Sequence, residues 1–233
     1  IAGEGIVNEG INSTQLGIKG SAALAEHMQI ARDLYLLEYT GGKLHIPTIS
    51  SAASVKLIKE AKKKGLKVSC SVSAHHLILT DNELGSFDSN VKVTPPLRTK
   101  NDTKALLKGL KDGVIDMITS DHNPIDVEHK KLEFSHAKFG TIGLESLFGA
   151  VNSVLDLETI IKALTIHPRA IFNQEVTSIK KDSIANLTLF NPDGISDFLN
   201  ENILSTSKNS AFLGKKLKGK VYGVFANKKL VLN

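Results

Sequence analysis

The sequence has 233 residues, enough to bury a hydrophobic core as one large domain or two small ones. Hydrophobic residues make up 41% and charged residues 23%, which excludes a collagen-like, disordered or disulfide-rich chain. The formal net charge is +5, but the lysines are scattered, aromatic residues make up only 5%, and tryptophan is absent. Platforms for stacking bases are therefore poorly supplied, and we expect no nucleic-acid partner.

Neither a membrane span nor a signal peptide is visible in the sequence. No run of 18 or more apolar residues occurs, and no basic segment followed by an apolar core stands at the N-terminus. The single cysteine, Cys70, cannot form an internal disulfide and is typical of a reducing compartment. We therefore expect a cytoplasmic protein that makes no membrane contact. Because Ile1 is not an initiator methionine, we also expect the natural chain to begin upstream.

The first predicted element is a helix over residues 21–39. Its apolar residues recur at helical spacing, Glu26 and Asp33 fall off that stripe, and Gly41 and Gly42 end it. The stripe consists of Leu24, Met28, Ala31, Leu34 and Tyr35.

An alternation of strands and helices follows. A helix capped by Ser50 or Ser51 runs through about Lys64, and Gly65 suits the position just after it. Asn101 or Asp102 can cap a later helix, which runs through Lys111. Strands joined by such short helical links are typical of a parallel sheet. We predict consecutive parallel strands over residues 44–49, 66–72, 91–94 and 114–119.

The chain changes character toward its C-terminus. Helices are expected over 144–154 and 157–164, and Pro168 can open a short one. After about Asn173 helical periodicity fades, and segments 186–190, 220–225 and 227–232 have the composition of strands. We therefore divide the chain into an α/β part, residues 1–175, and a β-rich part, residues 176–233.

Three polar clusters follow predicted parallel strands. His45 and Thr48 end the first strand, His75 and His76 follow the second, and Asp121 lies in a cluster after the last. In α/β barrels the loops after the strands converge on one face, where imidazole and carboxylate groups from different strands can share a metal. Each cluster also has a structural reading, as a packed histidine pair or a turn. Their joint placement favours an α/β barrel with a metal-hydrolase site.

The motifs and their order resemble the dihydroorotase branch of the cyclic amidohydrolases. The resemblance covers nearly the whole chain, and its segments occur in the expected order. They are 8–10 (NEG), 31–33 (ARD), 44–50 (LHIPTIS), 75–81 (HHLILTD), 92–98 (KVTPPLR), 115–124 (IDMITSDHNP), 139–145 (FGTIGLE) and 217–221 (LKGKV).

The resemblance implies a fold and a reaction. Residues 1–175 would form the C-terminal part of a (β/α)8 TIM-type barrel, and residues 176–233 would form part of a composite β-sandwich. The implied reaction interconverts N-carbamoyl-aspartate and dihydroorotate in pyrimidine synthesis, with zinc as the metal cofactor. Asp121 would bind metal and shuttle the proton, and His75 would be a second metal ligand. Thr94 and Gly140 would contact the substrate.

The sequence also departs from the family pattern at positions that bind metal or substrate. Thr48 stands where the family has a histidine ligand, and a neutral hydroxyl is a weak zinc ligand. Thr94 replaces an asparagine, and Ile125 replaces a histidine that helps bind the substrate carboxylate. The family's N-terminal metal ligands are not visible in this sequence. We therefore expect weak or absent zinc, and no dihydroorotate hydrolysis by this stretch alone.

Two further interpretations stay open. One is a non-catalytic dihydroorotase homologue that serves as a structural partner of aspartate carbamoyltransferase. The other is a different cyclic amidase, such as an allantoinase or hydantoinase relative, which the segments at 95–98 and 139–140 disfavour. The expected partners are a small-molecule substrate, further copies of the chain in a homo-oligomer, and aspartate carbamoyltransferase.

Overall fold

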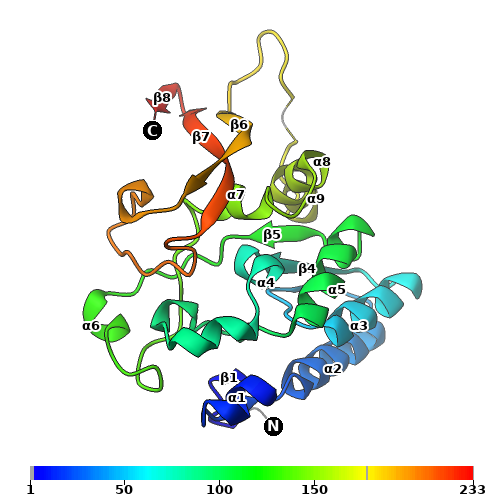
Figure 1. Ribbon diagram of the computed structural model, residues 1–233. Helices are drawn as coiled ribbons and strands as arrows, with labels where there is room; N and C mark the ends of the chain where they lie inside the picture. Colours follow the sequence, from blue (N-terminus) through cyan, green and yellow to red (C-terminus); the bar gives the residue numbers. More distant parts are fainter. Residues whose placement is uncertain (1–2, 177, 233) are drawn as a thin grey trace.

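A three-stranded parallel sheet is the centre of the fold in the computed structural model, which describes residues 3–176 and 178–232 (Figure 1). Its strands are β3 (Leu44–Ile46), β4 (Val68–Ser73) and β5 (Met117–Thr119), in the order β3-β4-β5. Ile46 pairs with Cys70, and Val72 pairs with Ile118. The predicted strands at 44–49, 66–72 and 114–119 are therefore confirmed, although the first and the last are three residues long, half the predicted length.

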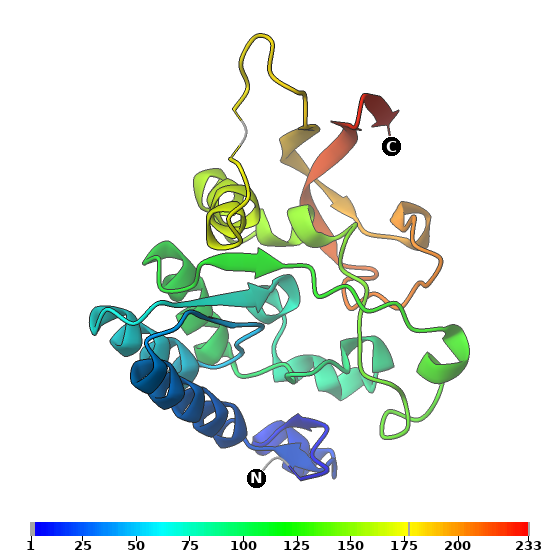
Figure 2. The ribbon, with the colours of Figure 1, turned by 180° about the vertical axis from the view of Figure 1, so that it is seen from behind.

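Helices α2 (Leu24–Thr40), α3 (Ala52–Lys63) and α5 (Lys100–Lys111) lie together on one side of the sheet (Figures 1 and 2). The α3 helix starts as predicted, because the Ser51 side chain accepts a hydrogen bond from the backbone N–H of Ser54. The predicted N-cap of α5 was two or three residues late. Thr99 is the N-cap, and Asp102, the third residue of the helix, completes a capping box with it.

Helix α2 buries a different face from the predicted stripe. Its buried residues are Ile30, Leu34 and Leu37, which pack into the main hydrophobic core. Of the predicted stripe, Leu34 is buried, whereas Leu24, Met28 and Tyr35 are exposed. The helix therefore has two apolar faces, of which one packs against the core.

The segment 91–94 is not a strand, so that prediction was wrong. The 3-10 helix η2 (Ser89–Val91) leads into irregular backbone, and β4 pairs directly with β5. Val91 and Val93 pack into a second hydrophobic cluster. Pro95 and Pro96 follow at once and lack backbone N–H groups, so the segment could not extend a hydrogen-bonded ladder.

Short helices complete the α/β part. The expected helix at 144–154 is the shorter α7 (Leu147–Val151). Helix α8 (Leu157–Ile161) continues through a π-helical turn, η3 (Lys162–Ile166), into α9 (His167–Ile171), with Pro168 in its first turn. The other short helices of this part are α1 (Ile11–Gln15), α4 (Ala74–Ile78), η1 (Asp81–Ser86) and α6 (Val127–Lys130), and η4 (Asn200–Asn202) lies in the β-rich part. Within the described residues, no helix has the length and apolar character needed to cross a membrane.

The strands expected toward the C-terminus are present, and they form one antiparallel sheet. Its order is β6 (Leu187–Asp197), β7 (Lys216–Ala226) and β8 (Lys229–Leu232). In both views this sheet lies at the opposite end of the molecule from the N-terminal residues (Figures 1 and 2). The division between residues 175 and 176 stays a prediction.

A small N-terminal unit was not predicted. Strands β1 (Val7–Asn8) and β2 (Gly20–Ser21) pair in parallel. Arg98 ties this unit to the rest, because its Nη1 donates to Asn8 Oδ1 and to the carbonyl of Ser21, each at 3.0 Å. Its Nη2 also lies 3.9 Å from Glu26 Oε2, within ion-pair distance.

Candidate active site

His75 and Asp121 meet beyond the carboxyl ends of β4 and β5. His75 lies in the first turn of α4, directly after β4, and Asp121 lies two residues after β5. His75 Nε2 is 3.7 Å from Asp121 Oδ2. The convergence of these two side chains, predicted from their positions after neighbouring strands, is therefore confirmed.

Burial controls the protonation of both groups. His75 is 1% exposed, and this burial, with a smaller contribution from His76, lowers its pKa well below 6.5. At neutral pH its imidazole is uncharged, so its contact with Asp121 is not an ion pair. His75 Nε2 is buried and has no hydrogen-bond partner. A buried nitrogen without a partner is costly for folding alone and is suited to a ligand.

Asp121 is held in an unusual backbone conformation. Its φ is +45°, and its N–H donates to Thr119 Oγ1 at 3.2 Å. Burial raises the pKa of its carboxyl group, while a hydrogen bond from Asn123 Nδ2 acts in the opposite direction. The carboxylate therefore binds a proton more readily than a solvated aspartate does.

Thr48 occupies the corresponding position after β3. Its φ is +49°, and its N–H donates to Ser71 Oγ at 3.1 Å. His45 is engaged elsewhere: its Nδ1 lies 2.9 Å from Ser69 Oγ, and its ring packs edge-on against Phe172. His45 therefore does not supply the histidine ligand that is missing at position 48.

The two remaining histidines of the motifs have structural contacts. His76 is buried; its Nδ1 lies 2.6 Å from Ser73 Oγ, and its Nε2 lies 3.0 Å from the carbonyl of Pro95. His122 Nδ1 accepts hydrogen bonds from the N–H groups of Gly143 and Leu144. Both histidines therefore fix loop backbone beside the site.

Gly140 and Thr94, the two predicted substrate contacts, both lie on loops. The Gly140 N–H donates to the carbonyl of Lys92, and its carbonyl accepts from Lys130 Nζ and Asn209 Nδ2. Its φ is +131°, and a Cβ there would lie 2.8 Å from Asn123 Cβ. Glycine therefore allows two loops to approach closely. Thr94 is exposed.

A buried lysine that the sequence did not reveal fastens this loop region. Lys130 Nζ donates to the carbonyls of Ser89, Lys138 and Gly140 at 2.6 to 2.9 Å. Burial lowers its pKa to about 8. Because its partners lie 8, 10 and 41 residues away, no local pattern marks this role.

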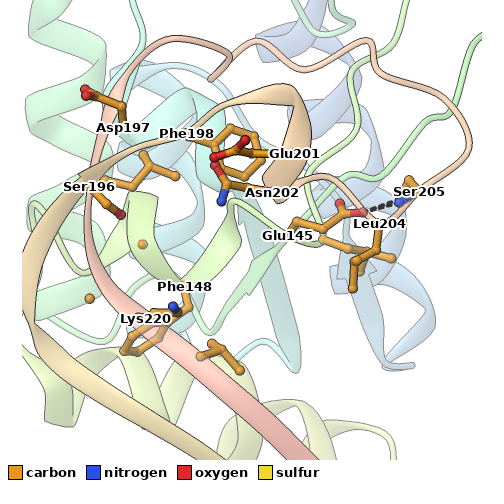
Figure 3. Close-up of a pocket in the computed structure, with 15 residues that line it drawn as sticks. Glu145, Phe148, Ser196, Asp197, Phe198, Glu201, Asn202, Leu204, Ser205 and Lys220 are labelled. Carbon is orange, nitrogen blue, oxygen red and sulfur yellow. Dashed lines mark hydrogen bonds between the residues drawn. The ribbon is translucent and has the colours of Figure 1, made fainter. Parts of the chain in front are cut away.

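A separate pocket of about 830 Å³ lies between α7, β7 and η4 (Figure 3). Glu145 is on its wall, and Glu145 Oε1 accepts hydrogen bonds from the N–H and the hydroxyl of Ser205. Much of the remaining wall is apolar and includes Phe148, Phe198 and Leu217. No local sequence pattern predicts this pocket, because residues from distant segments line it.

His75 and Asp121 could form part of a metal centre. A neutral imidazole nitrogen without a partner and a nearby carboxylate are suitable zinc ligands. Among residues 3–176 and 178–232, however, no three His, Cys, Asp or Glu side chains are grouped so that they could hold a metal ion. His75 and Asp121 are therefore two ligands, where catalytic zinc sites have three.

Comparison with known proteins identifies the family. The model of the amidohydrolase family matches residues 21–231. The chain belongs to the amidohydrolase family. Amidohydrolases are generally metal-dependent, which agrees with the two ligand-type side chains of the site.

Curated relatives of this amidohydrolase include enzymes named dihydroorotase. The chain is 42% identical over 226 residues to that of Carboxydothermus hydrogenoformans, covering 94% of this chain and 53% of the relative. It is 41% identical over 222 residues to that of Endomicrobium trichonymphae, covering 92% and 53%. The chain thus spans about half the length of the curated relatives it matches.

Solved structures confirm the fold of this amidohydrolase. An L-hydantoinase (dihydropyrimidinase) from Arthrobacter aurescens matches with a TM-score of 0.82 and 24% identity, over 92% of this chain and 50% of that one. The inactive dihydroorotase-like domain of a CAD-like multifunctional protein from Chaetomium thermophilum matches with a TM-score of 0.66 and 23% identity, over 86% and 54%. The α/β class, with a partial TIM-type barrel and a C-terminal β-rich part, is confirmed.

Proposed function

We propose that this chain is the C-terminal half of a dihydroorotase-type enzyme, which interconverts dihydroorotate and N-carbamoyl-aspartate in the cytoplasm. The observation that carries the proposal is the partnerless, buried and neutral His75 Nε2, 3.7 Å from the Asp121 carboxylate. The 42% identity to an enzyme named dihydroorotase supports the choice of substrate. The substrate is a small molecule, and the active form is a homo-oligomer.

Asp121 carries the proton in this proposal. Burial raises the pKa of its carboxyl group, so it accepts a proton from the attacking water and returns it to the leaving amide nitrogen. Asn123 Nδ2 donates to both the carbonyl and Oδ1 of Asp121 and holds the carboxylate in place. His75 and Asp121 would hold zinc, which, when bound, supplies a hydroxide near neutral pH and polarises the amide carbonyl.

Thr94 and Gly140 are the proposed substrate contacts. The exposed Thr94 offers a hydroxyl, and Gly140 offers space beside Asn123. Ile125 has no polar side-chain atom to replace the histidine that the family resemblance implies at its position. The substrate carboxylate must therefore be bound by another group.

A second candidate function is supported by Thr48. A threonine hydroxyl in place of an imidazole leaves the described residues with two ligands, fewer than a catalytic zinc site requires. The second candidate is a non-catalytic homologue that acts as a structural partner of aspartate carbamoyltransferase. A matching domain described as inactive shows that this fold also occurs without activity.

Metal analysis and a hydrolysis assay of the natural full-length protein test the two functions. The enzyme proposal predicts bound zinc that is lost in His75→Ala, and turnover of dihydroorotate that is lost in Asp121→Asn. Both variants should keep the wild-type circular dichroism spectrum, which serves as the folding control. Wild-type protein without zinc or turnover would overturn the enzyme proposal.

A gain-of-ligand variant separates the candidates further. In a non-catalytic homologue, Thr48→His should raise the zinc affinity, because it restores the third side chain to a site that already holds two. Thr48→Ser is the matched control and should leave the affinity unchanged. A wild-type protein that binds zinc as tightly as Thr48→His would argue against the second candidate.

A further inference from the structure

A buried asparagine in the loop before β7 lies against the segment that follows Asp121. Residues 205–210 read STSKNS, the composition of an exposed loop, yet Asn209 is only 5% exposed. The loop is held against the core, because Phe212 belongs to the second hydrophobic cluster together with Ile142. A polar side chain that is buried in this way requires hydrogen-bond partners, and those partners show what it holds in place.

The side-chain amide of Asn209 uses its oxygen and its nitrogen on backbone groups. Its Oδ1 accepts a hydrogen bond from the N–H of Ile125 at 3.2 Å. Its Nδ2 donates to the carbonyl of Asn123 at 3.0 Å and to that of Gly140 at 3.3 Å. Turning the amide over would set its NH2 group against an N–H and its oxygen against two carbonyls. These partners therefore fix one orientation of the side chain.

These bonds extend a short parallel pairing beside the site. His122 and Thr141 form an isolated parallel bridge, and the N–H of Asn123 donates to the carbonyl of Thr141 at 2.8 Å. Beyond this point Asn209 binds a carbonyl and an N–H that lie two residues apart, at 123 and 125. A residue on a neighbouring parallel strand makes the same pair of bonds. The side chain therefore takes the place of a strand where the ladder ends.

The backbone of Asn209 binds the other segment of the pair. Its carbonyl accepts hydrogen bonds from the N–H of Ile142 at 3.0 Å and from Thr141 Oγ1 at 3.1 Å. The Thr141 hydroxyl in turn accepts from the N–H of Ala211 at 2.8 Å. Asn209 therefore joins both segments of the pair to the loop before β7.

The segment that Asn209 anchors in turn holds Asp121. Asn123 Nδ2 donates to the backbone carbonyl and to Oδ1 of Asp121, each at 3.1 Å. The φ of Asp121 is +45°, a conformation that persists only where neighbouring contacts enforce it. The position of Asn123 therefore bears directly on that of the carboxylate, which lies 3.7 Å from His75 Nε2.

We propose that Asn209 is a positioning residue for Asp121. Its side-chain amide fixes the backbone of residues 123–125, and from there Asn123 fixes the carboxylate that carries the proton. The inference rests on the proposed function, because proton transfer by Asp121 is the step that this positioning serves. It also gives the β-rich part of the chain a role in the reaction.

Steady-state kinetics of the natural full-length protein with dihydroorotate provide the first test. Asn209→Leu keeps the approximate size of the side chain and removes its hydrogen bonds, whereas Asn209→Asp replaces only Nδ2, with an oxygen that faces two carbonyls. Both variants should lower kcat by about 10-fold to 100-fold, the range expected when a reacting group is displaced by up to about 1 Å. KM should stay within about 2-fold, because Gly140 keeps its bonds to Lys92 and Lys130.

Asn152→Leu is the matched control. Asn152 is also 5% exposed, and its Nδ2 donates to the carbonyls of Pro192 and Lys218 at 2.8 and 3.0 Å, neither of which belongs to the candidate active site. This variant should lose stability in urea denaturation as Asn209→Leu does, while its kcat stays at the wild-type value. A loss of kcat that arises only from weaker folding would appear in both variants.

Hydrogen exchange tests the positioning without the reaction. In peptides that cover residues 120–126, backbone N–H groups should exchange at least about 10-fold faster in Asn209→Leu than in the wild type or Asn152→Leu, because the Ile125 N–H loses its acceptor. This measurement needs neither zinc nor turnover. A wild-type protein without turnover would therefore refute the proposed function, and the exchange rates would still decide whether Asn209 fixes the backbone beside Asp121.

A double variant tests the route through Asn123. In an Asn123→Ala background, Asn209→Leu should lower kcat by no more than about 3-fold, because the side chain through which it acts is already gone. If Asn209→Leu does not fold, Asn209→Asp, which differs from the wild type by a single group, carries the same comparisons.

Several results would overturn the inference. They are fully additive losses of kcat in the double variant, wild-type kcat in both Asn209 variants, and a loss of kcat in Asn152→Leu equal to that in Asn209→Leu. Unchanged exchange of residues 120–126 in Asn209→Leu would overturn it as well.

Discussion

Gly143 controls the backbone that positions Asp121, and Gly143→Ala should disturb both stability and site geometry. A Cβ at Gly143 would lie 2.2 Å from the carbonyl oxygen of Ser120. Carbon–oxygen contacts in proteins are about 3.3 Å or longer, so the backbone before Asp121 must move by about 1 Å. Because the obstacle is backbone rather than a flexible side chain, we expect a loss of about 2–3 kcal/mol in the free energy of unfolding.

The displacement should also weaken metal binding, since the 3.7 Å separation between His75 Nε2 and Asp121 Oδ2 depends on that backbone. Urea denaturation followed by far-UV circular dichroism measures the stability, because the sequence has no tryptophan to report by fluorescence. Gly85→Ala is the matched control, since a Cβ there meets nothing within 4 Å. Equal stability of the two variants would refute the steric reasoning.

Three further predictions concern buried polar groups. Arg98→Met should cost about 3–5 kcal/mol in urea denaturation, because it leaves the Glu26 carboxylate and Asn8 Oδ1 without their cation; a loss below about 1 kcal/mol would contradict this. Burial lowers the pKa of Lys130 in the folded state to about 8, below its usual 10.5. As the pH rises, the folded state therefore releases this proton before the unfolded state does. The contribution of Lys130 to the free energy of unfolding thus rises between about pH 8 and 10.5. The free energy of unfolding of the wild type should therefore rise, relative to that of Lys130→Met, by up to about 3 kcal/mol across that window. A relative stability that does not change with pH would refute this prediction. Burial and the nearby Asp116 raise the pKa of the Cys70 thiol to about 12, so a thiol reagent at pH 8 should label it only after denaturant is added, and labelling of the native protein within minutes would be the contrary result.

The parts of the fold that follow local rules could be predicted from the sequence. Ser51 and Gly65 bound α3 because capping depends on neighbouring residues, and the strands at 44–46 and 68–73 are short segments with apolar residues at alternate positions, lying between helices. Segment 91–94 has a similar composition, yet its valines pack into the second cluster. Helix α2 carries two apolar stripes, and only tertiary contacts decide that Ile30, Leu34 and Leu37 enter the core.

The candidate site divides in the same way. His75 and Asp121 could be brought together from sequence, because both directly follow neighbouring parallel strands. The carbonyls that accept hydrogen bonds from Lys130, and the Ser50 and Ser54 hydroxyls that donate to the Glu26 carboxylate, could not be predicted. Their partners come from distant segments, and no periodicity encodes a contact such as that between Ser50 and Glu26.

Thr48 and Asp121 show why backbone and chemistry must be considered separately. Both are non-glycine residues with positive φ, +49° and +45°, and both receive a hydroxyl acceptor for their N–H, from Ser71 and Thr119. Such conformations are strained, especially for a β-branched threonine, and persist only where the surrounding structure enforces them. The fold therefore presents a side chain at the end of β3 as it does at the end of β5, whichever residue stands there. Whether this face binds a metal then depends on the side chain at position 48 more than on the backbone that carries it.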